Sequence, residues 1–221
     1  MAAGVVKKTI RLAVEHETAK RKGSRFITAA WPLVSGAEAA THHSSQGGGD
    51  SAQRQVKALL AQQSAKFPLA CHHCYAYTTL DGREFCSDDG EPHNTAGKPI
   101  LAALHRAQLV DVCIVVSRIF GGTLLGTGGL IRAYGAAAQE VLEHAQIIDK
   151  VPTTVLRAKV PFSHIDVVKH ACTRFLADIV AQDYESATGA DFTLRVPELH
   201  VQELLDFLRS KSSGSIRIKS L

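Results

Sequence analysis

The last third of the chain carries the pattern that most limits its fold. Segments rich in β-branched residues, typical of strands, alternate along the chain with segments whose apolar residues have helical spacing. The predicted elements are a strand at 154–162, a helix at 165–176, strands at 178–185 and 191–196, a helix opened by Pro197, and a strand at 216–221. Strand, helix, strand, strand, helix, strand is the order of a ferredoxin-like βαββαβ domain, and we expect that fold here.

Finer features of this domain also follow from the sequence. Ser163 is expected to cap the first helix, because a serine hydroxyl can accept from a free helix N–H group. The second helix is expected to direct four leucines inward: Leu199, Leu204, Leu205 and Leu208. Every inward position is aliphatic or aromatic, so we expect a docking or stabilising module rather than a catalytic domain.

The preceding residues, 1–150, indicate a separate domain that mixes strands and helices. Pro152 ends the long helix before it, which places the boundary between the domains 1–150 and 151–221. Strands are predicted at 9–14, 25–31, 72–79 and 112–120, with helices at 52–64, 96–108 and 130–145. Gly47, Gly48 and Gly49 predict a flexible surface loop at 44–50. The whole chain is therefore expected to be an α+β protein of two domains.

Composition excludes some classes of protein. Hydrophobic residues make up 45% and charged residues 21% of 221 residues, enough apolar side chain for a packed core. No apolar run approaches the roughly 18 residues that cross a bilayer, and no signal-peptide core is visible, so we expect a cytoplasmic protein without a membrane partner. Five cysteines in a reducing compartment predict no disulfides. The net charge of +4 permits contact with nucleic acid but does not require it.

Three carboxylates are crowded into one turn, Ser87-Asp88-Asp89-Gly90-Glu91-Pro92. Such close like charges raise one another's pKa unless donors or cations meet them. In one interpretation Asp88 or Asp89 accepts from local backbone N–H groups and Thr95 caps the helix at 96–108. In the other, the three acids hold Mg²⁺ or act as catalytic acid and base opposite His72 and Arg118. His72, Asp88, Asp89 and Glu91 are the candidate catalytic residues.

A glycine-rich segment joins the strand at 112–120 to the next helix. Its glycines are Gly121, Gly122, Gly126, Gly128 and Gly129. The backbone N–H groups of such a loop can converge on an anion, with Arg118, Lys98 and Arg132 as cations nearby. The loop lacks the Gly-Lys-Ser/Thr of a P-loop, so it does not specify a nucleotide. Equally, the glycines can serve positive φ angles and close packing against the sheet.

The run Cys71-His72-His73-Cys74, with Cys86 further along, raises the question of zinc. In a strand, Cys71 and His73 face one way while His72 and Cys74 face the other, so one ion cannot easily collect all four. No second C-x-x-C or H-x-x-x-H pair is present to complete a site. We therefore expect neither a metal nor another cofactor.

Several ordered motifs together resemble the YigZ/IMPACT family. They are Ser24-Arg25-Phe26-Ile27, His72 to Tyr77, Ser87 to Pro92 with Thr95 to Pro99, and Arg118 to Tyr134. The resemblance covers about residues 20–146, and the tail is similar to the domain that follows in bacterial YigZ proteins. It implies a two-layer front domain like a ribosomal protein domain and domain four of elongation factor G. It implies a tail like other elongation factor domains.

The resemblance also bears on function. Eukaryotic IMPACT proteins restrain a stress kinase of translation through an additional N-terminal RWD domain, for which we expect no room before Thr9. The bacterial arrangement is the closer match and implies ribosome or nucleic-acid association. The leading hypothesis is a non-enzymatic, translation-associated protein that contacts RNA, the ribosome or a regulatory factor, with Lys20, Arg21, Lys22 and Arg25 extending the glycine-loop surface. The alternative is an enzyme or a protein that binds a small phosphorylated ligand or metal.

Overall fold

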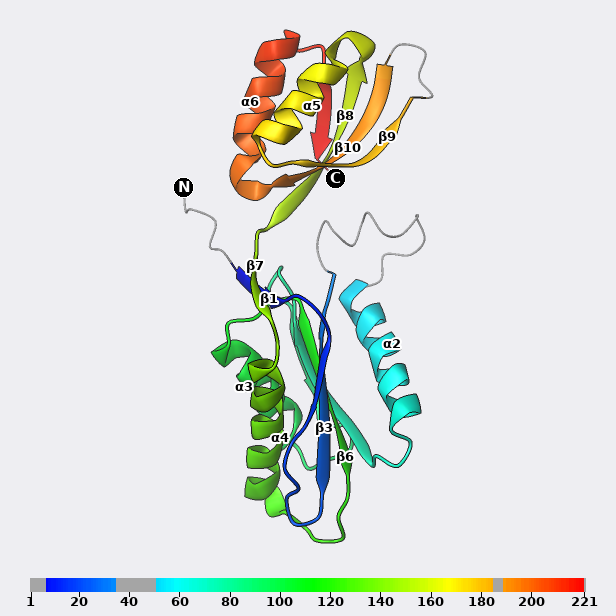
Figure 1. The fold of residues 1–221 in the computed structure, drawn as a ribbon, viewed down its shortest axis with the longest axis vertical. Coiled ribbons are helices and arrows are strands. Elements are labelled where there is room, and N and C mark those ends of the chain that lie inside the picture. The colour runs from blue at the N-terminus through cyan, green and yellow to red at the C-terminus, as the bar shows by residue number, and fades with distance from the viewer. Residues whose placement is uncertain (1–6, 35–50, 185–188, 221) are drawn as a thin grey trace. The chain divides into compact units, whose positions relative to one another are not determined.

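The computed structural model describes residues 7–34, 51–184 and 189–220 (Figure 1). The described residues from Lys7 to Lys150 form one compact unit, and those from Val151 onward form a second. The glycine-rich loop predicted at 44–50 lies outside the described residues. We describe each unit by itself, as the N-terminal and the C-terminal unit.

The N-terminal unit is built on a five-stranded antiparallel sheet. In the order β2-β3-β6-β4-β5, its strands are Val14–Glu17, Arg25–Pro32, Val112–Ile119, His72–Thr78 and Glu84–Ser87. Central β6 pairs with β3 along Arg25 to Pro32 and with β4 along His72 to Thr78. His72, at the start of β4, therefore pairs with Arg118, near the end of β6, at the end of the sheet where the glycine loop begins.

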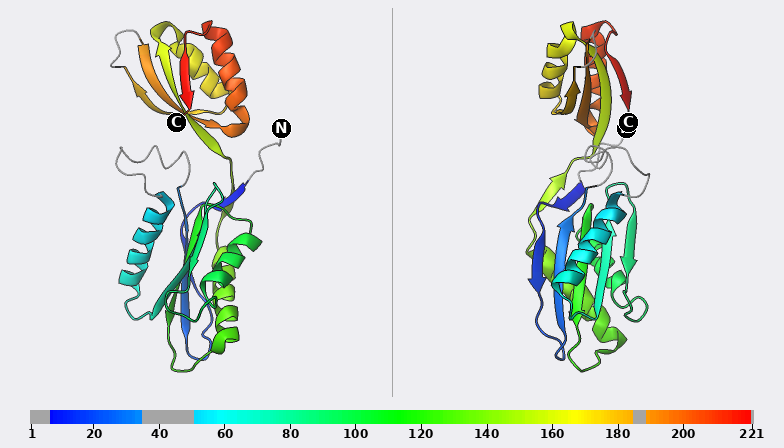
Figure 2. Two further views of the ribbon diagram at one scale, coloured as in Figure 1. Left: turned by 180° about the vertical axis from the view of Figure 1, so that it is seen from behind. Right: turned by 90° about the vertical axis from the view of Figure 1, so that its right-hand side faces the viewer.

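Helices cover both faces of this sheet. Helices α3 (Gly97–Arg106) and α4 (Gly126–Glu143) pack on one face, and α2 (Ser51–Lys66) lies on the other (Figures 1 and 2). The alternation of β6 explains both contacts, because Ile114 and Val116 belong to the large core under α3 and α4, whereas Cys113 and Val115 belong to the smaller core under α2. A strand buried on both faces needs a continuous apolar run, and 112–116 provides it.

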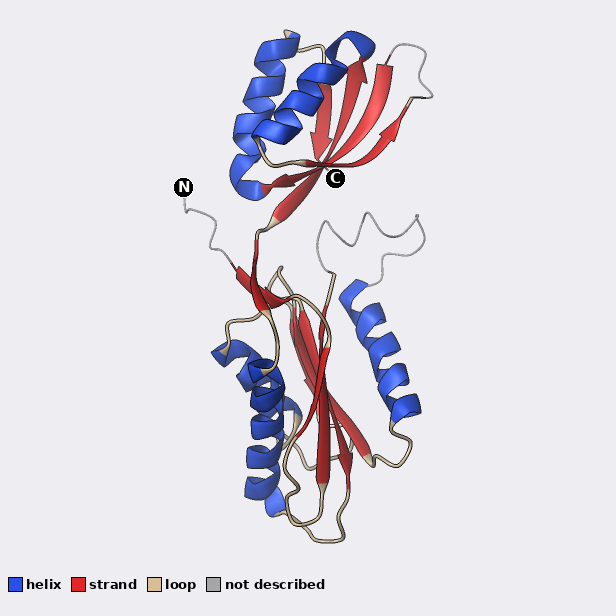
Figure 3. Cartoon of the chain, viewed as in Figure 1, coloured by secondary structure: helices blue, strands red, loops and turns tan. Residues whose placement is uncertain are grey.

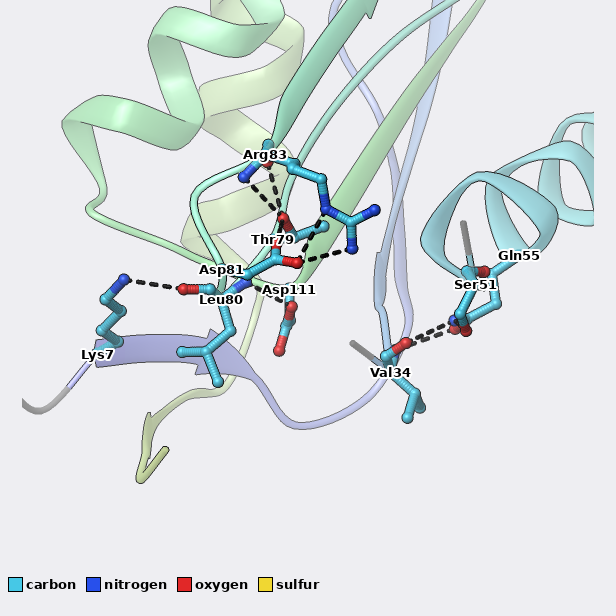
Figure 4. Close-up of polar contacts among 9 residues, drawn as sticks. All are labelled: Lys7, Val34, Ser51, Gln55, Thr79, Leu80, Asp81, Arg83 and Asp111. Carbon is cyan, nitrogen blue, oxygen red and sulfur yellow. Dashed lines mark hydrogen bonds and ion pairs between the residues drawn. The ribbon is translucent and has the colours of Figure 1, made fainter. Parts of the chain in front are cut away.

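Polar side chains fix the ends of these elements (Figure 4). Gln55 of α2 mimics a backbone partner: its Nε2 donates to the Val34 carbonyl at 2.7 Å and its Oε1 accepts from the Val34 N–H at 3.0 Å. Asp111, just before β6, accepts from the Leu80 N–H at 2.8 Å and pairs with Lys150 at 2.6 Å. Lys150 belongs to β7 (Ile147–Lys150), which pairs antiparallel with β1 (Lys7–Ile10).

The C-terminal unit contains one four-stranded antiparallel sheet with two helices on one of its faces (Figure 3). Along the chain the elements are β8 (Thr153–Pro161), α5 (Ile165–Arg174), β9 (Asp178–Asp183), β10 (Gly189–Pro197), α6 (Val201–Ser212) and β11 (Arg217–Ser220). Short 3₁₀ turns at Phe162–His164 and Glu198–His200 precede the helices. The strands lie in the order β11-β8-β10-β9, and the apolar faces of α5 and α6 close the core.

The α+β class is confirmed, but the two-layer arrangement implied for the N-terminal unit is wrong, because α2 covers the second face of its sheet. Several local predictions are wrong as well. The strand predicted at 9–14 is two strands, β1 and β2, separated by a bend at Arg11 and Leu12. Ser163 does not cap α5, since the N-cap residue is His164 and no side chain bonds there. Leu199 is 57% exposed because the 3₁₀ turn delays the start of α6, whereas Leu204 and Leu208 are buried as predicted.

Two glycines that begin or line helices give a matched test of this packing. A Cβ on Gly97 would lie 2.8–2.9 Å from the backbone of Ser87, closer than non-bonded atoms come, whereas one on Gly135 would meet Pro99 at an ordinary 3.8 Å. Gly97→Ala should therefore lower the free energy of unfolding by about 1–3 kcal/mol. Gly135→Ala should raise it by roughly 0.5–1 kcal/mol through helix propensity.

Trp31 is the sole tryptophan and lies in β3, so urea unfolding followed by its fluorescence reports on the N-terminal unit. Equal midpoints for Gly97→Ala and the wild type would contradict the close approach of α3 to Ser87.

Candidate functional site

The acidic turn that follows β5 uses its first acid to begin helix α3. Asp88 Oδ1 accepts from the N–H groups of Ala96 at 2.9 Å and Gly97 at 2.8 Å, and Oδ2 accepts from Asn94 at 2.8 Å. Burial alone raises the pKa of Asp88, but these three donors outweigh it and lower the pKa below its usual value. Asp88 thus takes the capping role that the sequence also offered to Thr95, whose hydroxyl instead donates to the Pro92 carbonyl at 2.7 Å.

The second acid ties the turn to strand β4. Asp89 has a positive φ of 42°, and its Oδ2 accepts from the backbone N–H of His73 at 2.6 Å. Nδ1 of His72 lies 2.7 Å from the Asp89 carbonyl oxygen, so the ring donates there. Gly90 comes next with a φ of 84°, and a Cβ there would approach the His72 ring at 3.3 Å. His72 therefore packs beside the turn with one ring nitrogen already engaged.

The third acid is buried and paired. Glu91 Oε1 accepts from Arg118 Nη1 at 2.6 Å and from the Tyr134 hydroxyl at 2.8 Å. The side chains of Arg118 and Glu91 are only 7% and 3% exposed. Phe26 and Phe120 each lie within 6 Å of the guanidinium, at 5.7 and 5.6 Å from ring centroid to Cζ. One carboxylate oxygen thus joins the acidic turn, strand β6 and helix α4.

The glycine loop begins in direct contact with the turn between β2 and β3. A Cβ on Gly121 would lie 1.9 Å from the Gly23 carbonyl carbon, so the two backbones touch and only glycine fits. Ser24 completes the contact, because its hydroxyl accepts from the Gly121 N–H at 3.2 Å and from Arg118 Nη2 at 3.4 Å. Gly122 has a φ of 86°. The close packing predicted for these glycines is therefore present at Gly121, and the predicted positive φ is present at Gly122.

The later glycines belong to a helix instead of a loop. Helix α4 begins at Gly126, four residues before the predicted start, so Gly128 and Gly129 lie in its first turn. Among the described residues, no side chain accepts from its N-terminal N–H groups, and no acidic residue lies in that turn. Gly126 and Gly128 are exposed, as is Arg132 one turn later. Lys98 is also exposed but lies in the first turn of α3, where that helix meets β5.

The acidic turn and the glycine loop border one cavity of about 490 Å³. Glu91 and Pro92 come from the turn, Arg118 and Phe120 from the end of β6, and Thr127 from the start of α4; Cys71, His72, Gly90, Leu124, Leu125, Gly126 and Leu130 complete the lining. The structure thus brings together His72, Glu91, Arg118 and Gly126. Asp88, Asp89 and Lys98 are not part of this lining.

The four residues of the Cys71-His72-His73-Cys74 run lie in different environments, although Cys71, which precedes β4, lines the same cavity as His72 instead of the opposite face. Cys74 is buried and its thiol lies 2.9 Å from the Asp88 carbonyl oxygen, while Cys71 is exposed. Burial raises the pKa of Cys74 to about 12, so the thiol stays protonated at neutral pH. His73 Nδ1 lies 2.9 Å from Ser117 Oγ. Within residues 7–34, 51–184 and 189–220, no three His, Cys, Asp or Glu side chains gather closely enough to hold a metal ion.

Residues 21–142 match the model of the Impact N-terminal domain, a segment that holds every motif of this site. The chain belongs to the IMPACT family. It is 35% identical to an IMPACT family member of Haemophilus influenzae over 170 residues, which span 75% of this chain and 82% of the relative. It is 33% identical to IMPACT family member YigZ of Escherichia coli over 172 residues, with the same coverage.

A solved structure extends the similarity to the whole chain. The crystal structure of a hypothetical protein is 27% identical, with a TM-score of 0.68 over 97% of both chains. Family membership thus agrees with the resemblance carried by the motifs. No helix in the described part of the chain is long and apolar enough to cross a membrane.

Two residues of the site escaped sequence reasoning. Tyr134 entered the sequence analysis only as the end of a family motif, and the structure places its hydroxyl on Glu91. Ser24 entered only as the start of another motif, with no role assigned to its hydroxyl. Arg118 lies near the end of a strand and Tyr134 lies on the helix that follows. Only this spacing could have indicated that Arg118 and Tyr134 contact the same carboxylate.

The Asp88 cap predicts a pH-dependent loss of stability. A carboxylate with a lowered folded-state pKa adds stability above its unfolded pKa of about 3.9 and loses it as pH falls through the folded value. Asp88→Asn should lower the free energy of unfolding by about 1–3 kcal/mol at pH 7, because the amide supplies one acceptor oxygen in place of two. Trp31 fluorescence in urea should show the difference between variant and wild type narrowing below about pH 4. A difference that stayed constant from pH 7 to pH 3 would contradict the charged cap.

Proposed function

We propose that this protein is a translation-associated binding protein whose N-terminal unit contacts phosphate groups of RNA, on the ribosome or on a factor-bound RNA, in the cytoplasm. The proposal takes the N-terminal unit as a relative of ribosomal protein and elongation factor G domain-four folds. It takes the C-terminal unit as ferredoxin-like, supported by the strand order β11-β8-β10-β9 with all pairs antiparallel.

The contact between Gly23 and Gly121 carries this proposal. It brings the turn that holds Lys20, Arg21 and Lys22 against the loop that leads into α4. Lys20 and Lys22 are exposed, and the first turn of α4 is exposed without a side-chain cap or an acidic residue. Cations beside free helix N–H groups match the charge and hydrogen-bonding needs of phosphate. Arg132 continues the same positive character along α4.

The other predicted cations take different roles in this proposal. Arg118 stabilises the start of the glycine loop within the unit, because its Nη1 donates to Glu91 and its Nη2 donates to Ser24. Arg25 is paired with Glu17 at 2.7 Å, which leaves it less suited to phosphate than its neighbours. The sequence hypothesis is thus refined: the surface consists of Lys20, Lys22, Arg132 and the N–H groups at Gly126 to Gly129.

The double variant Lys20→Gln/Lys22→Gln tests this surface. If each lysine contacts one phosphate, binding to labelled RNA should weaken, and the slope of log K against log salt should become shallower by about 1.4–1.8. Fluorescence anisotropy at several salt concentrations measures both. Lys169→Gln/Lys211→Gln, two exposed lysines of the C-terminal unit, removes the same charge as a control. Equal losses in the two doubles, or no retention of RNA or ribosomes by the wild type, would sink the proposal.

The cavity beside the glycine loop favours a second candidate function, the binding of a small phosphorylated ligand. Its lining is mainly apolar, with Arg118, Glu91, His72 and Thr127 among its polar groups, an arrangement common in small-molecule sites. Asp88 and Glu91 already accept from the protein's own donors, so any acid–base chemistry would fall to His72.

Thermal shift tests this second candidate. A phosphorylated metabolite at 100 times its Kd should stabilise the protein by about 2.7 kcal/mol and raise its Tm. Thr127→Val should abolish the effect, because it removes a hydroxyl at the cavity while keeping the shape. An unchanged Tm across phosphorylated metabolites, with and without Mg²⁺, would count against it.

A further inference from the structure

A second cavity, of about 440 Å³, lies on the opposite face of the N-terminal sheet, between α2 and the strands β4 and β5. Tyr75, Tyr77 and Phe85 line it from the sheet; Gln53, Arg54, Val56, Lys57 and Leu60 line it from α2. None of these residues belongs to the acidic turn or the glycine loop. The cavity therefore needs an explanation of its own.

The sheet side of this cavity is aromatic. Phe85 stacks with Tyr75 at 5.9 Å and with Tyr77 at 6.2 Å between ring centroids, and the planes differ by 29° and 26°. Phe85 is 50% exposed although it lies on a strand, so one ring of this set remains open to solvent. Open aromatic faces on a sheet accept the flat faces of unpaired bases without regard to sequence.

The helix side of this cavity is cationic. Arg54 and Lys57 are three residues apart on α2, a spacing that places them on neighbouring turns of one face. Both are exposed, and neither forms an ion pair with another described residue. The lining contains no acidic residue. The charge here complements an anion, which a purely apolar peptide does not carry.

Helix α2 is fastened at both ends, so the space between it and the sheet is fixed. Gln55 bonds both backbone groups of Val34 near the start, and Lys66 pairs with Glu15 at 2.7 Å at the end. Ala52 and Val56 are buried against the sheet. The cavity is thus a built feature of the unit and needs little rearrangement to accept a ligand.

We propose that this cavity binds one or two unpaired nucleotides of single-stranded RNA, with a base against Phe85 and Tyr75 and the flanking phosphates beside Arg54 and Lys57. The inference rests on the proposed function for the partner, RNA. It adds a second contact on the other face of the sheet and a preference for single strands. Duplex RNA cannot use this contact, because its bases stay stacked on one another.

The test compares a labelled ten-nucleotide oligouridine with a ten-base-pair RNA duplex by anisotropy. Phe85→Leu keeps the apolar bulk but removes the aromatic face, and should weaken oligouridine at least about fivefold while leaving the duplex unchanged. Arg54→Gln/Lys57→Gln should make the salt slope for oligouridine shallower by about 1.4. Phe162→Leu, at a ring 49% exposed in the C-terminal unit, is the matched control. Urea midpoints from Trp31 fluorescence verify that each N-terminal variant is folded.

The outcomes separate the two claims. If Lys20→Gln/Lys22→Gln weakens both RNAs while Phe85→Leu and Arg54→Gln/Lys57→Gln bind oligouridine like the wild type, the cavity proposal is wrong and the proposed function stands. If oligouridine depends on Phe85 and the Lys20→Gln/Lys22→Gln double has no effect on either RNA, the cavity stands and the glycine-loop surface does not. Saturation of the cavity by an apolar peptide, with no effect of oligouridine, would also overturn the inference.

Discussion

The buried pair of Glu91 and Arg118 is the interaction on which the N-terminal unit depends. It joins three segments that are far apart in sequence, because Tyr134 of α4 donates to the same carboxylate oxygen that accepts from Arg118 of β6. Burying two charges costs several kcal/mol each unless they are paired and hydrogen-bonded. Ser24 supplies a further acceptor, and Phe26 and Phe120 pack near the guanidinium. Removing either partner would leave the other charge buried and alone, which commonly costs about 3–5 kcal/mol.

This pairing explains why so acidic a turn can lie beside a surface proposed to bind phosphate. Each acid faces a donor inside the unit: Asp88 faces the N-terminus of α3, Asp89 faces the His73 N–H, and Glu91 faces Arg118. Glu91 is buried and Asp88 is half-buried, so little of their charge reaches solvent, whereas Asp89 is exposed. The lysines of the β2–β3 turn are meanwhile exposed at the same end of the sheet. The carboxylates thus hold the backbone segments of the unit together, while the lysines belong to the surface proposed to bind phosphate.

Sequence reasoning found the α+β class and most elements, because their apolar periods are long and regular. It missed β5 and β7, whose four residues are too short to show a period of two. It offered Asp88 as an acceptor of local N–H groups, a role available to any Asx turn. Its assignment of the helix cap to Thr95 was wrong, because the position of Asp88 at the start of α3 depends on how β5 meets α3. It set the three acids opposite Arg118 in one alternative but could not single out Glu91 as the buried partner, because 27 residues separate two side chains that only the sheet brings together.

The antiparallel sheet also explains how the two proposed binding surfaces can lie on one small unit. Strand β6 is buried on both faces. Helices α3 and α4 must therefore cover one face of the sheet, and α2 must cover the other. α2 leaves Phe85 of the edge strand β5 half exposed beside Arg54 and Lys57. Both surfaces are therefore mounted on the same rigid sheet and keep a fixed separation. A single strand long enough to reach both would bind the second intramolecularly, and its affinity would rise without any new contact. Length of the RNA, more than its sequence, would then govern selectivity.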